Sequence, residues 1–75
     1  MLEKHFGDKL VHFDGEHSMD VLHHMENHMS ANDHQELFNA AYHHGKVNFQ
    51  VRMPDSGQFK DVTLVHKDGK YSISL

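Results

Sequence analysis

Histidine is the residue type in this sequence that offers the most chemistry. Ten of the 75 residues are histidine, and nine of the ten precede Gly45. A neutral imidazole nitrogen binds zinc, nickel or copper, and the ring also titrates with an unperturbed pKa of about 6.5. Because the formal net charge is −4 with histidine neutral, full protonation would reverse its sign. The histidines therefore indicate either metal binding or a surface charge that depends on pH.

The spacing of two histidines fits a single metal ion. His24 and His28 are four residues apart, so on a helix both rings would lie on one face, with Asp20 one turn earlier. Further ligands would come from His43 or His44, provided that the helices carrying the two pairs run antiparallel. The simpler interpretation, which we favour, is that these are solvated surface residues, since the sequence contains neither HExxH nor a zinc-finger spacing.

Other kinds of site have less support in the sequence. Cysteine is absent, which excludes disulfide bonds and thiolate ligands. No nucleophile elbow or phosphate-binding glycine loop occurs, so we expect a protein that is not an enzyme and that needs no cofactor. No stretch approaches the roughly 20 apolar residues of a membrane span, and the opening residues lack the apolar segment of a signal peptide. A cytoplasmic location is expected.

The C-terminal part predicts an antiparallel meander with strands at about 46–53, 59–66 and 70–75. Apolar and polar residues alternate along the first two strands, and turn-forming residues separate them. Asp68-Gly69 is typical of a two-residue type I′ turn. This turn sets the register of the last two strands, which pairs His66 with Tyr71, Leu64 with Ile73 and Val62 with Leu75.

Two apolar stripes at helical spacing predict helices at about 19–29 and 33–44. Ser18 is the expected N-cap of the first helix, and Ser30 or Asn32 that of the second. Asp33 or Gln35 is placed to complete a capping box, and Gly45 is placed to end the second helix. His34 falls within the apolar stripe of the second helix. We expect both His34 and His66 to be partly buried and hydrogen-bonded.

The N-terminal residues are the least regular. Residues 9–13 favour a short strand ended by Asp14-Gly15, while residues 2–6 could form a single helical turn. The predicted fold is thus one α+β domain over residues 1–75, in which two short helices pack on one face of a three-stranded antiparallel meander. The strand at 9–13 would be an additional, edge strand.

Charge is unevenly distributed along the chain. Residues 1–45 hold two lysines against eight acidic residues, whereas residues 46–75 hold five basic residues against three acidic ones. Two helices followed by a hairpin resemble a winged-helix DNA binder in outline, but the second helix contains no lysine or arginine. Binding of nucleic acid is therefore the weaker hypothesis.

A small group of residues is predicted to face away from the core. The strand register turns Phe59 and Val65 outward near Arg52, where they could contact another protein or a second copy of the chain. We therefore expect a non-enzymatic protein-binding or regulatory module, which would bind another protein through its acidic helices or a sheet edge. A histidine-based transition-metal site is the alternative.

Overall fold

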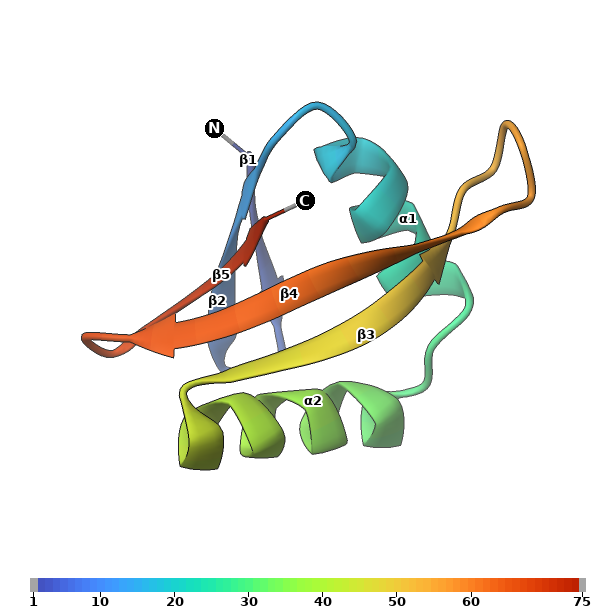
Figure 1. Cartoon of the computed structure of the whole chain (residues 1–75). Helices are drawn as coiled ribbons and strands as arrows, with labels where there is room; N and C mark the ends of the chain where they lie inside the picture. The colour runs from blue at the N-terminus through green and yellow to red at the C-terminus, as the bar shows by residue number, and fades with distance from the viewer. Residues whose placement is uncertain (1, 75) are drawn as a thin grey trace.

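The computed structural model describes residues 2–74, which form an α+β fold with helices on one side of a twisted, mixed sheet (Figure 1). The strands are arranged in the order β1-β2-β5-β4-β3. The elements follow the chain as β1 (Leu2–Phe6), β2 (Lys9–Asp14), α1 (Ser18–Asn27), α2 (Ala31–His44), β3 (Lys46–Arg52), β4 (Phe59–Lys67) and β5 (Lys70–Ser74). Helix α1 lies against β2 and β3, and α2 lies against β3 and β4. The predicted α+β class is confirmed.

The predicted meander is present as β3, β4 and β5. Asp68 and Gly69 have φ values of 54° and 76°, the positive values that a type I′ turn requires at both central positions. As predicted, this register pairs His66 with Tyr71 and Leu64 with Ile73. The third predicted pair, Val62 with Leu75, lies outside the described residues.

The prediction for the N-terminal residues was wrong in two respects. Residues 2–6 form strand β1 and not a helical turn, because Gly7, with φ at 67°, opens a tight turn that folds β1 back onto β2. Strand β2 is not at the edge, since it also pairs in parallel with β5 and lies between β1 and β5. The interior position of β2 accounts for Val11 and Phe13, which are only 0% and 1% exposed.

Side chains at the helix ends explain where the helices begin. The hydroxyl of Ser30 accepts from the Asp33 N–H at 3.1 Å, and the Asp33 carboxylate accepts from the Ser30 N–H at 3.0 Å. This is the predicted capping box, and its hydrogen bonds lower the pKa of Asp33. The predicted cap of α1 was wrong, because His17 occupies the cap position and the Ser18 hydroxyl donates to the carbonyl of Gly15.

The core lies between the helices and one face of the sheet. Its buried side chains come from β2, from both helices and from the meander: Val11, Phe13, Val21, Leu22, Met25, Phe38, Ala41, Val51, Met53, Val62, Leu64, Tyr71 and Ile73. Alternate residues of each strand point to the other face, which no helix of residues 2–74 covers. We call this the uncovered face; on it the register places Arg52 beside Phe59, and Glu3, His12, Ser72, Val65 and Lys46 in one row across the strands.

Candidate functional site

Three histidines gather at the C-terminal end of α1. The ring centroids of His24 and His28 lie 5.5 Å apart, and those of His23 and His28 lie 6.1 Å apart. The pair predicted from its spacing is therefore brought together, with His23 as a neighbour that the sequence did not single out. Helical spacing does not predict the contact between His23 and His28. The two residues are five positions apart, and the backbone of His28 is not helical, with φ −120° and ψ 2°.

The remaining predicted metal ligands lie elsewhere. His43 and His44 are at the far end of α2, whose 14 residues extend about 20 Å from α1. Figure 1 shows α2 running across the sheet away from α1 and not back alongside it. Asp20 instead contacts the Nδ1 atom of His17 at 3.3 Å. Within residues 2–74, no three histidine or acidic side chains are arranged to hold a metal ion.

His24 links α1 to the sheet. The backbone N–H of Arg52, the last residue of β3, donates to Nδ1 of His24 at 3.3 Å. A nitrogen that accepts carries no hydrogen, so the proton of the neutral ring is on Nε2. Burial lowers the pKa of His24, and repulsion from His28 and His23 lowers it further. The ring therefore favours the neutral form that this hydrogen bond requires.

This hydrogen bond predicts a pH dependence of stability. Because the folded-state pKa of His24 is below its ordinary value of 6.5, the unfolded chain binds more protons between the two pKa values. The contribution of His24 to the free energy of unfolding is therefore fully present above pH 6.5, and it is lost as the pH falls through the folded-state pKa. We expect His24→Asn, whose side-chain oxygen can accept from Arg52 without titrating, to make the free energy of unfolding less dependent on pH.

Urea denaturation between about pH 8 and 5.5 would measure this difference against the wild type. His44→Asn is the matched control, because His44 is exposed at the end of α2. Equal slopes for the wild type and His24→Asn would show that the bond between α1 and β3 does not respond to pH.

The predicted partner-binding residues lie on the uncovered face. Arg52 and Phe59 are direct neighbours across β3 and β4, and 62% of the surface of Phe59 is exposed. Val65 lies on the same face, half-buried and farther along β4, beside Lys46. Arg52 thus connects the histidines of α1 with the uncovered face. Its backbone N–H donates to His24, while its side chain lies on the uncovered face.

Charge separates the two layers of the fold. The uncovered face carries Lys46, Arg52, Lys67 and Lys70 against Glu3, Asp14 and Asp61. Helices α1 and α2 carry acidic residues and no lysine or arginine within Ser18–Asn27 and Ala31–His44. The asymmetry along the sequence thereby becomes an asymmetry between the helical layer and the sheet. The basic residues concentrate on β3, β4 and β5.

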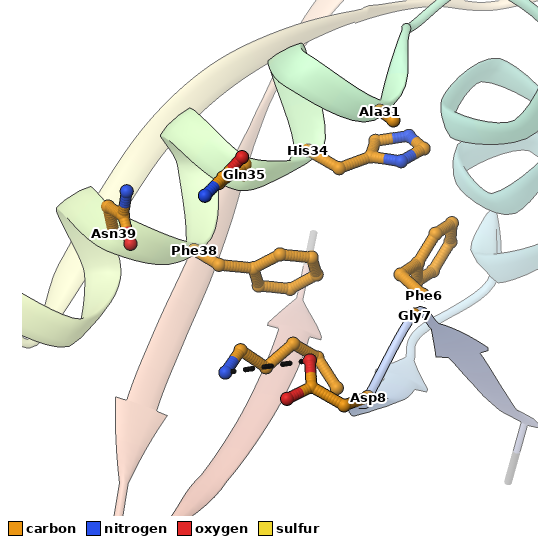
Figure 2. Close-up of a pocket in the computed structure, with 9 residues that line it drawn as sticks. Phe6, Gly7, Asp8, Ala31, His34, Gln35, Phe38 and Asn39 are labelled. Carbon is orange, nitrogen blue, oxygen red and sulfur yellow. Dashed lines mark ion pairs between the residues drawn. The ribbon is translucent and has the colours of Figure 1, made fainter.

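A hollow of about 390 Å³ lies between α2 and the turn from β1 to β2 (Figure 2). His34 lines this hollow, and its Nε2–H donates to the Met25 carbonyl at 2.6 Å. The centroids of the His34 and Phe6 rings lie 4.9 Å apart. The prediction of a partly buried, hydrogen-bonded His34 is confirmed. Because Nε2 is engaged with the backbone, His34 serves to join the two helices.

His66 also lies where the register predicted, and it is partly buried as expected. The predicted hydrogen bond was wrong, because within residues 2–74 its ring makes aromatic contacts only. Its ring packs between Tyr71, at a centroid distance of 4.6 Å, and the exposed Tyr42, at 5.2 Å. Tyr71 in turn meets the buried ring of Phe38 at 5.0 Å. His66 therefore joins the end of α2 to the core through aromatic contacts.

No protein-family model, no curated protein and no solved structure matches this chain. Among residues 2–74, no helix has the length and apolar character needed to cross a membrane.

Proposed function

We propose that this chain is a non-enzymatic protein-binding module whose uncovered face contacts an acidic surface of another protein. One observation carries the proposal: Phe59, 62% exposed, lies directly beside Arg52 on that face. Aromatic residues and arginine are the side chains most enriched at the centres of protein interfaces, where they contribute most of the binding energy.

The charges around this pair support an acidic partner. Lys46, Lys67 and Lys70 share the face with Arg52, so a negatively charged surface would be attracted and oriented by it. Val65 adds apolar area between the lysines at one end and Phe59 at the other. The acidic helices would at the same time repel such a partner from the opposite side of the molecule.

Photo-crosslinking provides the test. Benzoylphenylalanine replaces Phe59 in one version of the protein and Tyr42 in another, because the two side chains are almost equally exposed, at 62% and 63%, on opposite layers. Each version is illuminated in an extract of the cells from which the chain comes. We expect position 59 to form one dominant protein adduct that excess wild-type protein removes, and position 42 to form none. The same adducts at both positions, or none at 59, would contradict the proposal.

Arg52→Glu tests the role of charge in the same assay. We expect this variant to compete for the adduct about tenfold less well than the wild type, since it places like charge against an acidic partner. Lys60→Glu is the matched control, because Lys60 is exposed on β4 but points to the helix side of the sheet. An adduct that nuclease destroys would instead favour nucleic acid as the partner.

Transition-metal binding is the second candidate, favoured by the His24 and His28 rings, whose centroids lie 5.5 Å apart. It would rest on these two ligands, because no third histidine or acidic side chain of residues 2–74 completes a metal-binding group. A histidine that binds a metal through Nε2 carries its hydrogen on Nδ1, where it could no longer accept from Arg52. Zinc or nickel binding at His24 should therefore shift the amide resonance of Arg52.

The metal titration is read by NMR at individual amides and rings. If the site exists, His24→Ala or His28→Ala should abolish binding, whereas His43→Ala with His44→Ala should leave it unchanged. Weak shifts spread over all ten histidines would exclude a defined site.

A further inference from the structure

Strand β1 presents an open edge. It lies at the end of the sheet, and among residues 2–74 its only pairing strand is β2. Phe6 and Lys9 flank the two-residue turn and so exchange backbone hydrogen bonds. Hydrogen-bonded and non-hydrogen-bonded pairs alternate along an antiparallel ladder. The backbone N–H and C=O groups of Leu2, Lys4 and Phe6 therefore point to β2, and those of Glu3 and His5 point outward. Unpaired groups of this kind are a template for another strand.

We propose that β1 pairs antiparallel with β1 of a second copy, about a two-fold axis at Lys4, so that one sheet continues through both molecules. Glu3 of each copy would then exchange backbone hydrogen bonds with His5 of the other, and Leu2 would lie opposite Phe6. The inference goes beyond the proposed function because it uses a different surface, and the uncovered face remains available to a partner.

The side chains of Glu3 and His5 favour this register. Only three antiparallel, two-fold arrangements pair the outward-pointing groups of Glu3 and His5 with each other or with their own copies. One places Glu3 against Glu3, so that two carboxylates repel each other, and another places His5 against His5, which leaves both carboxylates without an imidazole from the other copy. The arrangement centred at Lys4 places each carboxylate opposite an imidazole, whose N–H can donate to it. This complementary hydrogen bonding favours the register centred at Lys4.

The neighbouring side chains are compatible with this pairing. Leu2 and Phe6 are half-buried at the margin of the core, and each would cover the other across the axis. The two Lys4 side chains would lie opposite one another, but each already contacts Glu26 of α1 at 3.5 Å, which offsets their charge. On the uncovered face Glu3 also contacts Nδ1 of His12 at 3.3 Å. The carboxylate would thus lie between two imidazoles, which explains why a polar edge could pair.

Amide hydrogen exchange provides a direct test at neutral pH. Because the pairing surface is small, we expect a weak dimer that forms as the concentration is raised towards about 1 mM, as measured by sedimentation equilibrium. Over that range, protection of the Glu3 and His5 amides should rise in proportion to the loss of monomer, by about twofold when half of the chains are paired, while the Lys4 and Phe6 amides, already bonded to β2, should change little. A monomer at every concentration, or equal changes at all four amides, would overturn the inference.

A charge exchange tests the register. Glu3→Lys should weaken the dimer about tenfold, and the double variant Glu3→Lys with His5→Glu should restore it at least to the wild-type level. Thermal unfolding at low concentration verifies that both variants fold. Failure of the second change to rescue the first would exclude this register. The crosslink from position 59 should still form in either variant, because neither change touches Phe59 or Arg52, so the outcomes for the two surfaces are separate.

Discussion

Phe38→Ala is expected to leave a large fraction of the protein unfolded at ambient temperature. The ring is only 4% exposed and packs against Tyr71 and Phe6, with centroid distances of 5.0 and 6.2 Å. Removing a buried phenylalanine ring costs about 3–5 kcal/mol, since both the transfer free energy and the packing contacts are lost. That cost is comparable to the whole stability expected of a domain of this size. Urea denaturation followed by circular dichroism would measure it.

Phe59→Ala is the matched control for Phe38→Ala. The same side chain is deleted, but Phe59 is 62% exposed on the uncovered face. We expect its free energy of unfolding to change by less than about 0.5 kcal/mol. If both variants lost similar stability, Phe59 would be a core residue and not part of a binding surface.

His34→Ala is expected to reduce the free energy of unfolding by about 1–3 kcal/mol. The Met25 carbonyl belongs to the last turn of α1, where carbonyls lack donors within the helix. The Nε2–H of His34 supplies that donor at 2.6 Å, and the ring also contacts Phe6. The substitution removes both interactions and should loosen α1 from α2.

His34→Gln distinguishes the hydrogen bond from the ring contact. Its amide can donate to Met25 but cannot replace the aromatic edge against Phe6, so we expect a smaller loss than for alanine. Denaturation of both variants at neutral pH would measure the difference. Equal losses would indicate that packing on Phe6 accounts for the whole effect of His34.

Local patterns were sufficient to predict the meander and α2. The alternation in β3 and β4, the Asp68-Gly69 turn and the box of Ser30 with Asp33 are each contained within a few residues. Strand β1 was not recognised because Lys4 points to the helix side, where an apolar residue is expected. Its charge contacts Glu26, more than 20 residues away, and no local pattern reports such a contact. The parallel pairing of Val11 with Tyr71 joins residues still farther apart in the sequence.

In the candidate site, too, the contacts within one element could be predicted from the sequence, and those between distant elements could not. The spacing of His24 and His28 was sufficient to bring their rings together, because both lie at the end of one helix. The positions of His43 and His44 depend on the orientation of α2 relative to α1. The residues around these two histidines do not determine that orientation. The hydrogen bond from Arg52 to His24 joins residues 28 positions apart and required the structure.

The interior position of β5 constrains how the chain can assemble. Residues 70–74 lie between β2 and β4, and so they join a hairpin made early in synthesis to a meander made late. Until they emerge from the ribosome, β2 and β4 each present a bare edge. Because Val11 and Tyr71 are far apart in the sequence, their pairing must overcome the entropy of closing a long loop, and we expect it to form late in folding. Without β5 between them, β2 and β4 would each keep an unpaired edge on which another chain could form a strand.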